Sequence, residues 1–84
     1  MSGILIAGNA VHDILVRAVE ELEWGRSRWV DIEHGLGGNG ANTAFAAAVL
    51  GARVRLAAFI GTDAAGDDTM RRLASAGVDT RDVV

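Results

Sequence analysis

The residues best suited to chemistry in this sequence lie in a glycine-rich run, GLGGNGANTAFAAAVLG, at positions 35–51. Asn39 and Asn42 are three residues apart, so on a helix their side-chain amides share one face of the first turn. Each amide both donates and accepts hydrogen bonds. Gly37 and Gly38 let a ligand approach the backbone without a Cβ in the way. Such a set suits a neutral polyol, whose hydroxyl groups also donate and accept.

Asp13 offers a carboxylate that could complete this site. It follows the apolar run GILIAG, at positions 3–8, which is typical of a strand buried on both faces of a parallel sheet. Ligands of open α/β sheets bind outside the carboxyl ends of the strands. A carboxylate at that edge can accept hydrogen bonds from two sugar hydroxyls at once.

Three other interpretations of the glycine run compete with polyol binding. Positions 35–40 satisfy G-x-G-x-x-G, and Asp63 lies at about the distance of a ribose-binding acid. That motif should follow the first buried strand, whereas here it follows WVDIEH, in which charged residues alternate with apolar ones. A P-loop needs a lysine, which the sequence lacks. The third interpretation is structural only, with Asn39 as a helix N-cap and the glycines as a turn.

A small antiparallel flap is predicted between Asp13 and the glycine run. A period of two over 15–20 and again over 29–33 indicates strands with one solvated face. Gly25 marks a turn between them. The alternative is a short helix over 19–24, where good helix formers gather.

The remaining elements predict an α/β fold. A buried helix is expected from Asn39 to Leu50, a second buried strand over 53–61 and a second helix over 64–76, followed by an extended tail. Gly51 and Gly77 should end the two helices, and Thr62 or Asp63 should cap the second. Two buried strands joined through a helix form a right-handed βαβ unit, the core of a doubly wound sheet.

Composition limits the classes of partner and compartment. A net charge of −3 argues against binding of nucleic acid or of an anionic membrane. The sequence has no cysteine, and two histidines are too few for zinc, so no metal site is predicted. Neither a signal segment nor a membrane-spanning run is visible, which favours a cytoplasmic protein.

Several other polar and aromatic residues are expected to have structural roles only. His34 is expected to be a solvated loop residue, and Asp68 to be one of the acids that favour a helix N-terminus. Arg71 and Arg72 fit a solvated helix face. Trp24 and Trp29 are expected to pack within the flap.

Four motifs resemble the signature of the ribokinase or pfkB family of carbohydrate kinases. GGNGANTA at positions 37–44 looks like the family's GG-[NK]-G-A-N-x-A. GNAVHD at 8–13, GTDAAG at 61–66 and LASAGVDT at 73–80 resemble its GxxxxD, GxDxxG and LxxxGVDT. The motifs keep their order and spacing over essentially the whole chain.

The resemblance implies a fold and a function. The fold would be the N-terminal part of a ribokinase-like doubly wound α/β sheet (βαβα), with residues 14–36 as an antiparallel β lid and residues 1–84 as one portion of the domain. The implied activity is ATP-dependent phosphorylation of a sugar or nucleoside hydroxyl, with Mg²⁺. The family's substrate-binding positions correspond to Asp13, Gly38, Asn39 and Asn42. Its catalytic base and ATP site would lie beyond Val84, so this portion alone is expected to be inactive.

Some positions depart from the family pattern. Val11 stands where an asparagine is common, which argues against ribose, and Asn39 stands where ribokinases often have lysine. The lid stretch also lacks the usual proline. The alternative function is a non-catalytic sugar-binding or interaction module of the same fold. The expected partners are a small sugar or nucleoside and, through the lid, a second copy of the chain in a homodimer.

Overall fold

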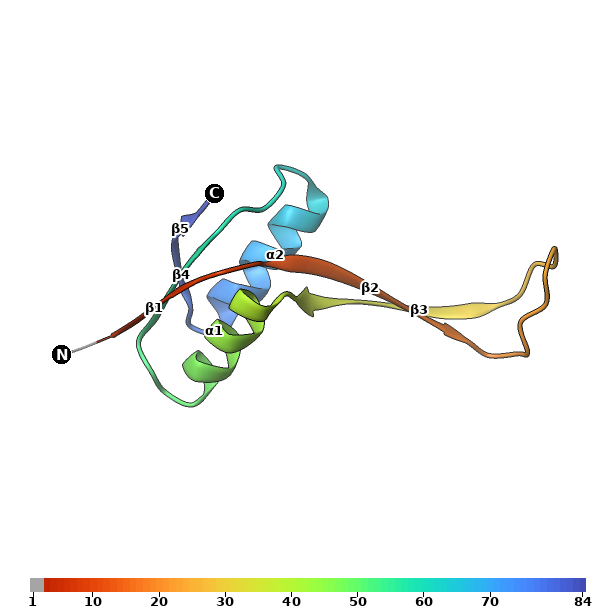
Figure 1. Ribbon diagram of the computed structural model, residues 1–84, viewed down its shortest axis with the longest axis horizontal. Helices are drawn as coiled ribbons and strands as arrows, with labels where there is room; N and C mark the ends of the chain where they lie inside the picture. The colour runs from red at the N-terminus through yellow and green to blue at the C-terminus, as the bar shows by residue number, and fades with distance from the viewer. Residues whose placement is uncertain (1–2) are drawn as a thin grey trace.

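The computed structural model describes residues 3–84, which form a three-stranded parallel sheet, a two-stranded antiparallel sheet and two helices (Figure 1). The parallel sheet has the order β1-β4-β5. Its strands are β1 (Ile4–Ala7), β4 (Val54–Ala58) and β5 (Asp79–Val83). Strands β2 (Val11–Ala18) and β3 (Val30–Gly37) pair as a hairpin, and helices α1 (Asn39–Val49) and α2 (Ala64–Ser75) make the two crossovers. The predicted α/β class with an inserted antiparallel segment is confirmed.

The core lies between the parallel sheet and the two helices. Each crossover runs from one parallel strand to the next, and two right-handed crossovers in the same direction put both helices on one face. Alternate residues of β4 point toward the helices and are buried, as the period of a strand requires. The buried apolar residues are Ala41, Ala44, Val54, Leu56, Ala58, Leu73, Val78 and Val83.

The helix boundaries follow from local chemistry, as predicted. The Asp63 carboxylate accepts a hydrogen bond from the Gly66 amide at 2.9 Å and caps α2. Gly51 and Gly77 have φ values of +95° and +94°, the left-handed conformation that ends a helix with least strain in glycine. Neither helix within residues 3–84 is long and apolar enough to cross a membrane.

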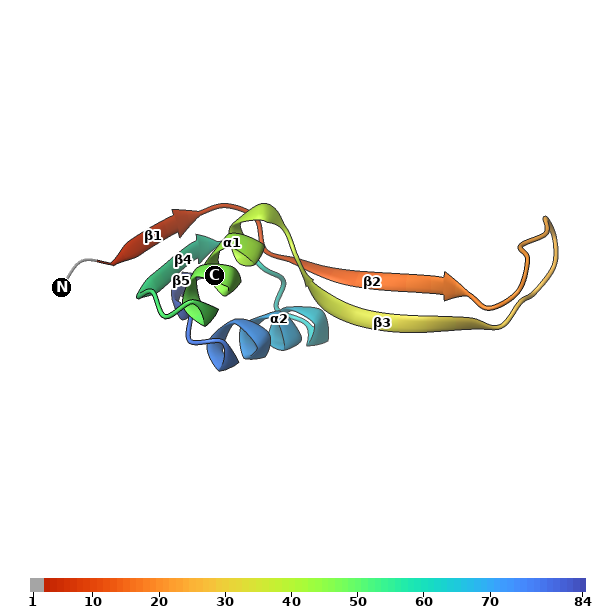
Figure 2. The same ribbon diagram turned by 90° about the horizontal axis from the view of Figure 1, so that it is seen from below.

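The hairpin projects from the body of the chain as an arm (Figure 2). The structure measures 56 × 27 × 18 Å, with a radius of gyration of 15.8 Å. A compact domain of this length would have a radius of gyration of about 12 Å. Only the base of the arm therefore packs against the body, through contacts of β2 and β3 with α2 and of β3 with α1.

One strand was not predicted, and one alternative is excluded. The tail after Gly77 is not merely extended but contains β5, which pairs in parallel with β4. The alternative helix over 19–24 does not form, because this stretch connects the two hairpin strands, with a turn near Gly25 at φ +72°. The hairpin itself spans Val11–Gly37, a little wider than the predicted 14–36.

The first strand and the first helix have the apolar pattern of buried elements, and within residues 3–84 each is covered on one face only. β1 is an edge strand with a helix on one face only, so Ile4 and Leu5 remain exposed. On α1, Ala41 and Ala44 face the sheet, whereas Phe45, Val49 and Leu50 are exposed. The sheet covers only the side of α1 that faces it, so the outer side of this helix stays exposed.

Candidate functional site

Asp13 and Gly37 come together at the base of the hairpin. Asp13 lies on β2 opposite Gly35, and Gly37 is the last residue of β3. The Asp13 carboxylate occupies the space beside the Gly37 Cα, so that a Cβ at position 37 would fall 2.5 Å from Asp13 Cγ. The missing side chain of Gly37 thus makes room for the carboxylate.

Gly38 turns the chain from β3 into α1. Its φ of +89° lies in the left-handed region that favours glycine, and a Cβ there would fall 2.5 Å from the carbonyl oxygen of Asn9. That carbonyl accepts a hydrogen bond from the Ala41 amide at 2.9 Å. The N-cap of α1 is Gly38, so the interpretation of Asn39 as a capping residue was wrong.

The two asparagines lie on the exposed side of the first turn of α1. Asn39 is the first helical residue, and its carbonyl accepts a hydrogen bond from Thr43 Oγ1 at 2.7 Å. Asn42 lines a hollow together with Leu36, Phe45, Arg72 and Ser75. The structure therefore joins Asp13 to the Gly37–Gly38 turn, while Asn42 lies beside a different depression between the two helices.

The surroundings of Asp13 are acidic. A shallow hollow on the hairpin is lined by Asp13, Glu33, His34 and their neighbours. Asp13 and Glu33 are on the same face, because alternate residues of paired strands point the same way. Two carboxylates there repel a phosphate group and favour a ligand that donates hydrogen bonds. The earlier G-x-G-x-x-G interpretation also fails on geometry, since Gly35 and Gly37 belong to the antiparallel strand β3.

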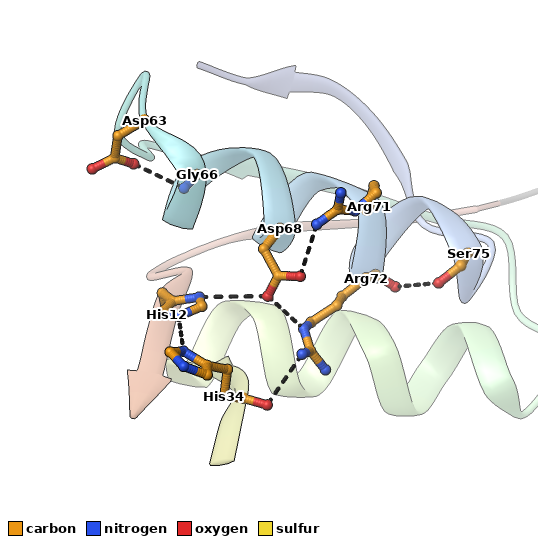
Figure 3. A network of polar contacts seen from close by, with 8 residues as sticks. All are labelled: His12, His34, Asp63, Gly66, Asp68, Arg71, Arg72 and Ser75. Atoms are coloured by element: carbon orange, nitrogen blue, oxygen red, sulfur yellow. Dashed lines mark hydrogen bonds and ion pairs between the residues drawn. The ribbon is translucent and has the colours of Figure 1, made fainter. Parts of the chain in front are cut away.

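A second polar cluster joins the hairpin to α2 (Figure 3). His12 Nε2 lies 2.9 Å from His34 Nδ1, and His12 Nδ1 lies 3.5 Å from an Asp68 carboxylate oxygen. Arg72 donates to Asp68 at 2.7 Å and to the His34 carbonyl at 3.1 Å. Arg71 donates to the other Asp68 oxygen at 3.0 Å. The hydrogen bonds from Arg72 and Arg71 hold the pKa of the Asp68 carboxyl below its usual value.

This cluster corrects two assignments made from the sequence. His34 lies on β3 and bonds another ring, so it is not a free loop residue, and Arg72 reaches the hairpin rather than only solvent. Within residues 3–84, no group of three histidine or acidic side chains is disposed to hold a metal ion. From the sequence, only the i, i+4 spacing of Asp68 and Arg72 could have indicated part of this cluster, because residues four apart on a helix are neighbours.

Comparison with known proteins identifies the class of this fold. Residues 3–84 match the pfkB family carbohydrate kinase. The chain therefore belongs to the pfkB family of carbohydrate kinases. No curated protein matches it in sequence.

Solved structures of sugar kinases share the fold. A ribokinase from Cryptococcus neoformans var. grubii, in complex with ADP, is 32% identical with a TM-score of 0.76, and the match covers 99% of this chain and 26% of that one. Fructokinase from Xylella fastidiosa is 34% identical (TM-score 0.80; 98% and 25% covered). Arabidopsis thaliana ribokinase with ribose and ATP is 26% identical (TM-score 0.83; 96% and 27% covered). The chain thus spans about a quarter of the length of these structures.

Proposed function

We propose that this chain forms the acceptor-binding part of an ATP-dependent carbohydrate kinase, which phosphorylates a hydroxyl of a sugar or nucleoside. The observation that carries the proposal is the Asp13 carboxylate against Gly37, directly before the Gly38 turn into α1. An exposed carboxylate can accept two hydroxyl hydrogen bonds, and the glycine backbone lets a sugar ring approach closely. Asn39 and Asn42 add amides on the exposed side of the same helical turn.

The phosphate donor is not expected to bind to these residues. The acidic pair Asp13 and Glu33 repels phosphate, and the described residues hold no cluster suited to Mg²⁺. ADP or ATP accompanies the related ribokinases named above, which supports ATP as the donor of the complete enzyme. The role of residues 3–84 is then to hold the acceptor, and without a base and a nucleotide they should not transfer phosphate.

The hairpin is proposed to act as the lid over this acceptor and to pair with a second copy. Its even-numbered residues Ile14, Val16 and Ile32 share the face opposite Asp13 and are more than half exposed. A two-stranded hairpin is marginally stable in water unless one apolar face is covered. A self-complementary contact of this face with the same face of a second copy would cover it.

Calorimetry with a panel of polyols tests acceptor binding. The panel contains ribose, fructose and adenosine, with inorganic phosphate and ATP as the anionic comparison. At least one polyol should bind, and Asp13→Asn should weaken it by about 10- to 100-fold, the range expected when a charged hydrogen-bond acceptor is lost. Asp31→Asn, on the same face but farther along the arm, is the matched control. Binding of phosphate in preference to every polyol, or unchanged affinity in Asp13→Asn, contradicts the proposal.

A further inference from the structure

The contacts between the hairpin and α2 form a closed ring of interactions. His12 on β2 bonds the ring of His34 on β3, Arg72 on α2 donates to the His34 carbonyl, and Asp68 connects Arg72 back to His12 (Figure 3). We call these four residues the hairpin latch. Both strands of the arm are tied to one helix, so the latch opposes rotation of the arm about its base.

The geometry of the two rings explains why they meet. His12 pairs in register with Leu36, and Ile14 pairs with His34, so the two histidines are diagonal neighbours on one face of the hairpin. Their ring centroids are 5.1 Å apart and the planes are tilted by 42°. The side chain of His12 is only 16% exposed, and its buried Nδ1 has no hydrogen-bond partner, although an Asp68 carboxylate oxygen lies 3.5 Å away.

The latch residues lie next to the proposed acceptor site. His12 directly precedes Asp13, and His34 directly precedes Gly35, which pairs with Asp13. Because successive residues of a strand point to opposite faces, holding His12 toward α2 directs Asp13 to the other face. We propose that Asp68 and Arg72 are positioning residues, which hold the hairpin through His12 and His34 so that Asp13 stays over the Gly37–Gly38 turn.

The hydrogen bond between the two histidine rings depends on how many protons the rings carry. The bond between His12 Nε2 and His34 Nδ1 contains one proton, carried by one of the two nitrogens. This bond can form when both rings are neutral or when only one of them is protonated. A proton on His12 Nδ1 would point toward Asp68. When both rings are imidazolium, two N–H groups face each other and the bond is lost. A second proton therefore breaks the ring of contacts between the two histidines and leaves the bond from Arg72 to the His34 carbonyl as the remaining hydrogen bond of the latch between the hairpin and α2.

The charged groups around His12 act in the same sense. Asp68 and Arg72 face it from α2, and Asp63, which shares a hollow with it, is held by the Gly66 amide. Helix α1 carries no charged residue. Asp13 and Glu33 lie on the opposite face of the hairpin. Asp68 is thus the carboxylate placed to pair with a positive charge on His12.

Energy transfer from the arm to α2 tests the latch without any ligand. Trp24 and Trp29 lie in the connection at the end of the arm and are the only tryptophans, and the sequence has no cysteine. An acceptor dye on Ala74→Cys, an exposed position of α2, therefore reports the distance from arm to body. The wild-type distance distribution should be narrow at about pH 8 and broaden toward about pH 5, where histidines gain protons.

Variants separate positioning from general structural support. Arg72→Gln and Asp68→Asn should show the broad distribution at every pH. Arg71→Gln, which loses a bond to Asp68 but none to the hairpin, should match wild type. His34→Gln keeps the carbonyl that Arg72 binds and removes one imidazole, so its distribution should no longer depend on pH. Circular dichroism checks that each variant is folded.

Some outcomes overturn the latch, and they differ from those that overturn the proposed function. Equal distributions in wild type, Arg71→Gln and Arg72→Gln, or a wild-type distribution that ignores pH, would refute it. The effect on hydroxyl binding rests on the proposed function: Arg72→Gln should weaken polyol binding severalfold, while Arg71→Gln should not. If no polyol binds to wild type but the distances respond as described, the acceptor assignment fails and the latch stands.

Discussion

The Asp13 carboxylate lies where the side chain of residue 37 would be if that residue were not glycine. The two residues come from opposite strands of the hairpin and meet at its base. The contact places an acceptor of hydrogen bonds immediately before the start of α1, and it depends on the absence of a single methyl group.

Gly37→Ala should therefore separate binding from stability. The added methyl group displaces a carboxylate on a side chain that can rotate away, so the free energy of unfolding should change by no more than about 1 kcal/mol. The carboxylate should leave its position, and polyol affinity measured by calorimetry should fall about tenfold or more. Gly35→Ala, whose Cβ would meet open space, serves as control. Equal losses in the two variants would show that carboxylate displacement is not the cause.

Gly38→Ala should instead destabilise the fold. A backbone conformation with φ +89° and ψ 143° costs a non-glycine residue about 1–3 kcal/mol. The added Cβ also strikes the Asn9 carbonyl oxygen, which belongs to rigid backbone. Gly51→Ala has a similar φ of +95° and open space around its Cβ, so it carries the first cost alone. Urea unfolding should rank wild type above Gly51→Ala and Gly51→Ala above Gly38→Ala; the reverse order for the two variants contradicts the steric argument.

Leu73→Ala should remove much of the stability of the chain. Leu73 is 0% exposed in the core, and such truncations cost about 2–5 kcal/mol. A chain of this length has a total of only about 4–13 kcal/mol. Leu50→Ala removes the same atoms from a residue that is 86% exposed and should change stability by less than about 0.5 kcal/mol. The measurement is the urea midpoint, and similar midpoints for both variants would refute this account of the core.

Asp68 should contribute stability that depends on pH. Its pKa is lower in the folded chain because Arg72 and Arg71 donate to the carboxylate. As the pH falls, the unfolded state takes up the proton first, so the contribution is complete above about pH 4 and is lost as the pH falls through the folded pKa. The difference in urea midpoint between wild type and Asp68→Asn should therefore shrink from pH 4 downward. A difference that stays constant to about pH 2 would contradict the ion pair.

The apolar face of the arm should control association. Ile32→Lys places a charge among Ile14 and Val16 on the exposed face, so a dimer formed through this face should dissociate. Light scattering at several protein concentrations gives the mass of each species. Glu33→Lys, on the other face, is the matched control. A wild-type monomer at all concentrations, or a dimer that survives Ile32→Lys, would exclude pairing through the hairpin.

Local signals in the sequence were reliable guides to the fold. Asp63, Gly51 and Gly77 each act within one helical turn of their own position, so their roles as cap and stops could be predicted. Burial could not, because it depends on what covers an element: the same apolar pattern in β1 and α1 lies half uncovered here. Strand β5 was missed because Asp79, Arg81 and Asp82 give it the composition of a solvated tail, although β4 supplies its hydrogen-bond partners.

The candidate site divides in the same way. The position of Asp13 after the first strand and that of Gly38 before the first helix could be predicted from motifs. The space beside Gly37 that the Asp13 carboxylate occupies could not be predicted, because it depends on the register of two strands. The latch brings together residues 12, 34, 68 and 72 from three elements, and no spacing rule connects positions so distant in sequence.

The register of the hairpin limits how its length can vary. The odd-numbered residues of β2, which include Asp13, lie on one face of the hairpin. The even-numbered residues, which include His12, Ile14 and Val16, lie on the other face. Inserting or deleting one residue within β2 would exchange the faces of everything beyond that point, since the side-chain period is two. Evolution of the arm by insertion and deletion is therefore expected only in the connection over 19–29, where Trp24 lies, so that the reach of the arm can change while its two faces stay assigned.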